Sequence, residues 1–148
     1  MNLILKVIAV MAFLLTQTAL AGKIDVEHYA ISADTQLPFS EAVRVGHMLY
    51  LSGQIGIDPA TSKLAEGGIA AETRQTLDNI KASLEKHGSS MDEVVKCTVY
   101  LADINEWAAM NKVYVTYFPS NPPARSALGT GGLALGSRTE IECMATVQ

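Results

Sequence analysis

The sequence predicts an α+β domain in which two helices pack on one face of a mixed β-sheet. Strand-like runs with alternating apolar residues come first, and two segments of helical periodicity follow, each succeeded by a further strand. Two amphipathic helices are enough to cover one face of such a sheet. The length of 148 residues allows one domain with a sizeable core.

The first 21 residues have the pattern of a cleaved export signal. Lys6 precedes a short apolar run, and the small residues Ala19 and Ala21 occupy the positions that a signal peptidase reads. The run is shorter than the about 20 apolar residues of a membrane-spanning helix, so an uncleaved anchor is the less favoured alternative. We expect a periplasmic or secreted mature domain over residues 22–148, without stable membrane association.

Composition limits the partners that this domain is expected to bind. The chain has 15 acidic and 11 basic side chains and a formal net charge of −4. Nucleic-acid-binding proteins neutralise phosphates with clustered lysine and arginine, and this sequence has no basic tract. We therefore expect no nucleic-acid partner. The three histidines lack the spacings of a metal site, so no bound metal is expected either.

Several short strands are predicted in the first part of the domain. A weak edge strand near residues 28–31 precedes a hairpin of residues 42–45 and 48–52, which turns at Gly46. A further strand over residues 53–57 ends at an Asp-Pro turn.

The first helix is predicted over residues 69–87 and ends at Gly88, because glycine tolerates the left-handed conformation that ends many helices. Thr73, Leu77 and Leu84 recur at helical spacing and mark its buried face. The residues predicted to face solvent are charged: Glu72, Arg74, Asp78, Lys81 and Glu85.

The second helix follows a predicted strand over residues 94–101 and is capped by Asp103 or Asn105. Its predicted buried side consists of larger residues: Trp107, Met110, Val113, Tyr114 and Tyr117. Pro119 stops this helix, and the last predicted strand covers residues 139–147. No strand is predicted between Pro119 and this last strand.

Alternation gives each of the two long strands an inner and an outer face. The inner faces are predicted to carry apolar residues and both cysteines: Val95, Cys97, Val99, Leu101, Ile141, Cys143, Ala145 and Val147. Two buried free thiols are favoured over a disulfide, which would need Cα atoms within about 7 Å. The outer faces, with residues such as Lys96 and Glu142, are of mixed polarity and predict association with a copy of the same chain.

Arg125 is the first candidate for a binding residue. Pro122 and Pro123 restrict the backbone before it, and a restrained arginine can present its planar guanidinium to a carboxylate through two hydrogen bonds. A surface arginine paired with an acid is an equal alternative. Glu140 and Glu142 are candidate proton acceptors, although a solvated strand face is the more common setting for such residues.

Five motifs are combined in this chain: Ser52-Gly53-Gln54, the run from Gln75 to Ile80, Asn111 with Tyr114, Pro123-Ala124-Arg125-Ser126, and Glu140-Ile141-Glu142. This combination resembles the RidA/YjgF family of reactive-intermediate imine deaminases, from about residue 38 to residue 147. The resemblance implies a chorismate-mutase-like fold, assembled as a homotrimer with clefts between subunits. It also implies hydrolysis of 2-imino acids and their enamine tautomers to 2-oxo acids and ammonia, without a cofactor.

The resemblance further implies roles for individual residues. Arg125 would bind the carboxylate of a small substrate, and Glu140 would be the second catalytic residue, which handles the attacking water. The residues implied to contact substrate are Phe39, Ser52, Gly53, Asn111, Ser126 and Ala127. Phe39 replaces a tyrosine of the deaminases and so lacks its hydroxyl, Ala127 stands where many relatives have cysteine, and the loop over residues 128–137 is unusually rich in glycine.

An exported imine deaminase is therefore the leading hypothesis. The missing hydroxyl at Phe39 suggests an alternative, a non-catalytic trimer that binds small carboxylate metabolites. A chaperone-like holdase is a third function compatible with the resemblance, and no residue of the sequence specifically indicates it.

Overall fold

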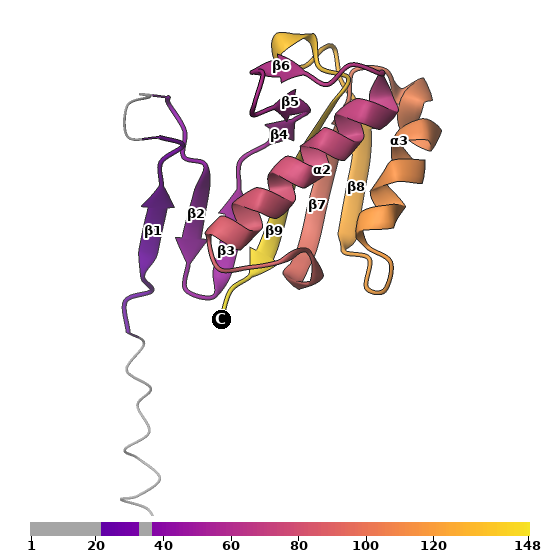
Figure 1. Cartoon of the computed structure of the whole chain (residues 1–148). Helices are drawn as coiled ribbons and strands as arrows, with labels where there is room; N and C mark the ends of the chain where they lie inside the picture. Colours follow the sequence, from indigo (N-terminus) through magenta and orange to yellow (C-terminus); the bar gives the residue numbers. More distant parts are fainter. Residues whose placement is uncertain (1–21, 33–36) are drawn as a thin grey trace, which may run out of the picture.

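A single mixed β-sheet with two helices on one face forms the domain in the computed structural model, which describes residues 22–32 and 37–148 (Figure 1). The predicted signal peptide, residues 1–21, lies outside the described residues. The strands of the sheet are β1 (Val26–Tyr29), β2 (Ala42–Val45), β3 (Met48–Leu51), β4 (Gln54–Ile55), β7 (Val94–Leu101), β8 (Ala124–Gly129) and β9 (Thr139–Thr146). A separate small hairpin consists of β5 (Ile57–Asp58) and β6 (Lys63–Leu64).

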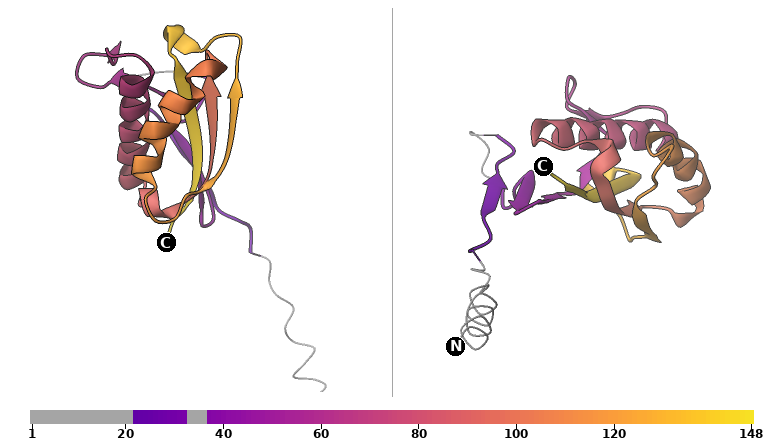
Figure 2. Two further views of the ribbon diagram at one scale, coloured as in Figure 1. Left: turned by 90° about the vertical axis from the view of Figure 1, so that its right-hand side faces the viewer. Right: turned by 90° about the horizontal axis from the view of Figure 1, so that it is seen from below.

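The two helices are α2 (Ile69–Lys86) and α3 (Trp107–Tyr114). Figure 2 shows both on the same side of the sheet, with the other side uncovered. The predicted α+β class and the placement of both helices on one face are thus confirmed. None of the helices in the described part of the chain is long and apolar enough to cross a membrane.

The strand order is β1-β2-β3-β9-β7-β8, and β4 continues the pairing of β3 along β9. All pairs are antiparallel except β7 and β8, which run parallel because the chain crosses over through α3 between them. No strand was predicted at Ala124–Gly129, and this prediction was wrong because these residues form β8. This edge strand is short and half exposed, and the prolines before it and the glycines after it hide its period of two.

The core lies between α2, α3 and the inner face of the central strands. Leu77, Ile80 and Leu84 of α2 are fully buried against Val99 and Ile141 of the sheet. Burial of these side chains provides most of the driving force for folding. The predicted first helix is confirmed to within one residue of its end, and Gly88 has the expected left-handed conformation with φ 78°.

Glu72 is buried, whereas the charge pattern placed it on the solvent face. Its side chain accepts a hydrogen bond of 2.8 Å from the backbone N–H of Arg138, in the loop before β9. The approach of α2 to the sheet explains this position, because a Cβ atom on Gly56 would lie 2.7 Å from the carbonyl oxygen of Glu72. The start of α2 therefore packs too closely for Glu72 to face solvent.

Two further predicted burial positions were wrong. The register of β7 shifts between Val94 and Lys96, so that Val94 is buried and Val95 is 44% exposed. A bulge adds one residue to one strand, so the side chains of the residues before it point to the opposite face of the sheet. Trp107, predicted on the buried side of the second helix, is 40% exposed and lies against the guanidinium group of Arg125.

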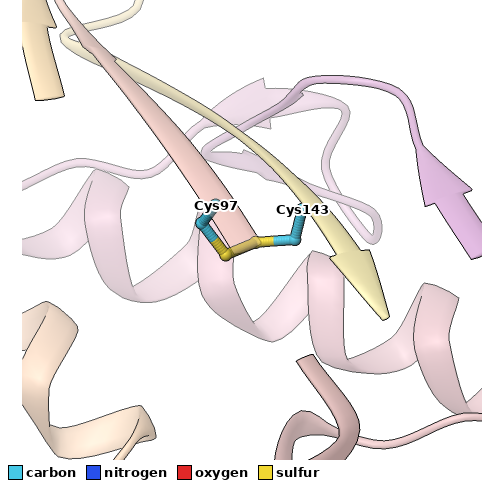
Figure 3. Close-up of a disulfide and its surroundings, with 2 residues drawn as sticks. All are labelled: Cys97 and Cys143. Atoms are coloured by element: carbon cyan, nitrogen blue, oxygen red, sulfur yellow. A yellow bond between two sulfur atoms is a disulfide. The ribbon is translucent and has the colours of Figure 1, made fainter. Parts of the chain in front are cut away.

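Cys97 and Cys143 form a disulfide, so the prediction of free thiols was wrong (Figure 3). The two residues are direct partners in the β7–β9 ladder, with Cα atoms 4.1 Å apart. Alternation correctly placed both on the inner face, but the register between strands separated by 46 residues cannot be read from the pattern of either strand.

The disulfide is expected to contribute strongly to stability. A Cys97→Ala/Cys143→Ala variant should lose about 2–4 kcal/mol of unfolding free energy, because the bond restricts the unfolded chain. Urea unfolding followed by circular dichroism measures this difference. Added reductant should destabilise the wild type to a similar extent and leave the stability of the double variant unchanged. Equal stability of the wild type and the double variant without reductant would contradict the prediction.

Candidate active site

Arg125 projects from β8 towards α3, on the helix-covered side of the sheet. It pairs in register with Cys97, whose side chain is in the core. Its Nη1 donates a hydrogen bond of 2.9 Å to Oδ1 of Asn111, and its guanidinium carbon lies 4.5 Å from the centre of the Tyr114 ring. Trp107 is 5.7 Å away on the same helix. These contacts hold the guanidinium group in one orientation.

Tyr114 lies beside Arg125 and was not among the predicted site residues. It is only 4% exposed, and its hydroxyl has no hydrogen-bond partner in the described part of the chain. Burial raises the pKa of Tyr114 to about 12, although the charge of Arg125 acts in the opposite direction. The phenol is therefore neutral and can donate a hydrogen bond. The spacing of three residues from Asn111, which places both on one helix face, could have identified it.

Arg125, Asn111 and Tyr114 line a cavity of about 300 Å³, together with Val115, Phe118, Pro122 and Pro123. Among the described residues that line it, Arg125 alone is charged. A planar cation at the wall of an otherwise apolar and aromatic cavity suits a small carboxylate, because the low polarity strengthens a charge-assisted hydrogen bond. Since β8 is the edge strand, some of its backbone N–H groups also point away from β7.

Glu140 belongs to a second cavity, of about 390 Å³, on the uncovered side of the sheet. It pairs with Tyr100 of β7 and Ile55 of β4. The cavity is lined by Phe39, Ser52, Gly53, Ile55, Ala134 and Glu140. Four of the eight predicted site residues thus come together here, while Ala134 and Ile55 were not predicted.

The interruption between β3 and β4 creates room for the Glu140 carboxylate. A Cβ atom on Gly53 would lie 2.1 Å from Oε1 of Glu140, so only glycine leaves space for this arrangement. Ser52, next to it, donates a hydrogen bond of 2.6 Å to the backbone carbonyl of Ser40. This bond ties the segment that carries Phe39 to the same place.

Substitution of two nearby glycines should distinguish an effect on catalysis from an effect on stability. Gly53→Ala is expected to lower kcat for imine hydrolysis at least about tenfold with little change in stability, because the flexible Glu140 side chain can move aside. Gly56→Ala should instead lower the melting temperature, because its Cβ would meet the backbone of α2 at Glu72. Kinetics and thermal unfolding of both variants test this contrast. A Gly53→Ala protein with wild-type kcat would contradict it.

Arg125 and Glu140 do not meet within one chain. They lie on opposite faces of the sheet and on strands separated by β7. Arg125 is in register with Cys143, and Glu140 is three residues before Cys143 on β9. With strands about 4.8 Å apart and a rise of about 3.3 Å per residue, their Cα atoms are about 14 Å apart.

Ser126 also faces the uncovered side, where Lys96 donates to its hydroxyl at 2.9 Å, whereas Ala127 packs against the core.

The described residues contain no cluster of three or more histidine, cysteine, aspartate or glutamate side chains that could hold a metal ion. The described chain thus places the Arg125 cavity on the helix-covered face of the sheet and the Glu140 cavity on the uncovered face.

Comparison with known proteins identifies the family. The family model described as endoribonuclease L-PSP matches residues 30–147. A human protein named 2-iminobutanoate/2-iminopropanoate deaminase is 47% identical over 108 residues, which are 73% of this chain and 79% of the human protein. The chain belongs to the RidA/YjgF family. Its fold agrees with that of solved members of the RidA/YjgF family.

The crystal structure of the E. coli YjgF gene product superposes with a TM-score of 0.72 at 32% identity, covering 82% of this chain and 94% of that one. E. coli TdcF, solved with bound serine, has a TM-score of 0.72 at 28% identity and covers 84% of this chain and 98% of its own.

Proposed function

We propose that this RidA/YjgF protein is an exported deaminase that hydrolyses 2-imino acids and their enamine tautomers to 2-oxo acids and ammonia. The site would form between copies of the chain, with the Arg125 cavity of one copy facing the Glu140 cavity of the next in a homotrimer. The observation that carries this proposal is the split of one set of reactive groups between two faces of the sheet.

Similar proteins support the substrate. Relatives at 47% identity carry the name 2-iminobutanoate/2-iminopropanoate deaminase, and the TdcF structure holds serine, an amino acid with the same carboxylate next to C2. The family model is described as an endoribonuclease, but RNA binding draws on clustered positive charge, and this chain has a net charge of −4.

The residues present account for each step of the reaction. Arg125 binds the carboxylate C1, which places the electrophilic C2 at the joint cavity. Glu140 accepts a proton from water as the oxygen attacks C2, and it passes this proton to the nitrogen as the C=N double bond becomes the C–N single bond of a tetrahedral carbinolamine. The proton of the carbinolamine hydroxyl then moves through Glu140 to the nitrogen, the C–O bond becomes a carbonyl, the C–N bond breaks, and ammonia and the 2-oxo acid leave. General acid–base help of this kind accelerates reactions by about 10²–10⁴-fold.

Complementation between two inactive variants tests the shared site. Arg125→Ala and Glu140→Gln chains, each inactive alone, are co-expressed with different tags, and the doubly tagged assemblies are purified. In a doubly tagged closed trimer, about a third of the sites, one of the three, pair an intact arginine with an intact glutamate. Loss of 2-iminopropanoate, produced in situ by an amino-acid oxidase, should recover accordingly. Mixed assemblies as inactive as their parents would overturn the shared site.

Export is supported by two independent features. Residues 1–21 have the order of a signal peptide, and the buried Cys97–Cys143 disulfide is typical of proteins that mature in an oxidising compartment. Mass spectrometry of the protein from its native cells should find Gly22 as the first residue and the disulfide intact, in the periplasmic or secreted fraction. An uncleaved, reduced chain in the cytoplasmic fraction would refute export.

A further inference from the structure

We propose that this site selects 2-imino acids with bulky, uncharged apolar side chains and rejects those with acidic side chains. This inference rests on the proposed function, because it takes Arg125 as the carboxylate contact and Glu140 as the group beside the reacting carbon. It goes beyond the names of the relatives, which specify only short side chains.

The position of the substrate side chain follows from its chemistry. In a 2-imino acid the carboxylate, the imine nitrogen and the side chain all radiate from C2. When Arg125 binds the carboxylate and C2 lies next to Glu140, the side chain begins in the cavity that surrounds Glu140. The lining of that cavity therefore determines which side chains fit.

Among the described residues, the side chains of this lining offer apolar contacts and no unpaired hydrogen-bond donor. Its polar side chains are those of Ser52 and Glu140, and the Ser52 hydroxyl already donates to the Ser40 carbonyl at 2.6 Å. The remaining side chains are those of Phe39, Ile55 and Ala134. Phe39 is 54% exposed, a large aromatic surface that gains from covering by an apolar group.

The available space extends beyond this cavity. An adjoining cavity of about 420 Å³ shares Phe39, Ser52, Gly53 and Ile55 with it. Its further lining combines the apolar residues Ile31, Ile57 and Pro59 with the polar residues Glu41, Gln54, Asn79 and Lys86. Lys86 is paired with Glu41, and the Asn79 amide donates to the carbonyls of Ile55 and Ile57. An isobutyl or benzyl side chain can therefore continue along Phe39 into this second hollow, whereas a methyl group leaves most of the apolar lining uncovered.

Charge explains the expected rejection of acidic side chains. Lys86 is the only cation among the described residues that line the two cavities, and its Nζ is 2.6 Å from Oε2 of Glu41. A side-chain carboxylate would lie near Glu140 with no unpaired cation to balance it. Desolvating such a charge without a partner is strongly unfavourable.

The substrate series tests the inference directly. Amino-acid oxidases generate the imines from L-alanine, L-phenylalanine and L-aspartate, and semicarbazide traps each imine as a semicarbazone. Hydrolysis of an imine is measured as the decrease in the semicarbazone that forms. The phenylalanine imine should have a kcat/KM at least about tenfold above that of the alanine imine, and the aspartate imine at least about tenfold below it. A preference for the alanine imine that still depends on Arg125 would overturn this inference and leave the proposed function intact.

A variant locates the selectivity. Phe39→Ala should lower the ratio of kcat/KM for the phenylalanine imine over the alanine imine at least about tenfold, because the aromatic wall is lost. Ile24→Ala removes an exposed apolar side chain outside both cavities and should leave the ratio unchanged. An unchanged ratio in Phe39→Ala would contradict the role of this wall.

Binding of non-reacting 2-oxo acids tests the selectivity independently of turnover. Calorimetry should find phenylpyruvate at least about tenfold tighter than pyruvate, and oxaloacetate weaker than both. This order in a protein without deaminase activity would support the inference while the proposed function fails. Equal affinities, a tighter oxaloacetate, or no binding of any of the three would overturn it.

Discussion

Replacing Arg125 by alanine should lower kcat/KM for 2-iminopropanoate by about 10²–10⁴-fold, because a bidentate, charge-assisted contact to the substrate carboxylate is lost. The loss should appear mainly in KM, with an additional effect on kcat from poorer orientation of C2. Steady-state kinetics with imine generated in situ measure both parameters. Arg125→Lys should recover only part of this loss, because an ammonium group cannot reproduce the planar fork.

The matched control for this prediction is Arg44→Ala. Arg44 lies on β2 and donates from Nε to the carbonyl of Gly46 at 2.9 Å, away from the lining of both site cavities. Its loss should change kcat/KM by no more than about twofold. A deaminase that tolerates Arg125→Ala as well as Arg44→Ala would not use Arg125 for its substrate.

Glu140→Gln should lower kcat by about 10²–10⁴-fold and change KM little, since the amide keeps the shape of the side chain and cannot accept the proton from water. Single-turnover kinetics, in which the imine is mixed with an excess of enzyme, would show that the chemical step is slowed. Thermal unfolding should be close to that of the wild type.

Glu142→Gln provides the neighbouring control. Glu142 lies on the same face of β9, two residues further along, and accepts a hydrogen bond of 3.2 Å from the Tyr100 hydroxyl. It does not line the Glu140 cavity. We expect kcat within about fivefold of the wild type, because a glutamine oxygen still accepts this bond. Equal losses in both variants would mean that negative charge on this face, rather than Glu140 itself, is required.

Local patterns were sufficient for the elements that carry the core. The spacing of Leu77 and Leu84 predicted α2, and alternation predicted the inner face of β9, because both depend only on neighbouring residues. Glu72 and Val95 were misplaced because their burial depends on the approach of α2 to Gly56 and on a bulge against β9. Those are properties of packing between distant segments.

The candidate site shows the same division. The motifs predicted Arg125 and Glu140 as a catalytic pair, and the structure shows that the two side chains lie on opposite faces of the sheet. This separation depends on the parallel strand β8, which was not predicted, and on its register with Cys97. Tyr114 was treated as a core residue, because an apolar helix face does not reveal that one of its hydroxyls is left without a partner.

The disulfide has a consequence for the alignment of the sheet. Cys97 and Cys143 are joined in the middle of β7 and β9, where a slip of one residue would turn every side chain of β9 to the other face. Glu140 would then point into the core and the cysteines would no longer face one another. The covalent bond forbids this alternative pairing, so oxidation of two core thiols sets the direction in which a glutamate three residues away on β9 must point.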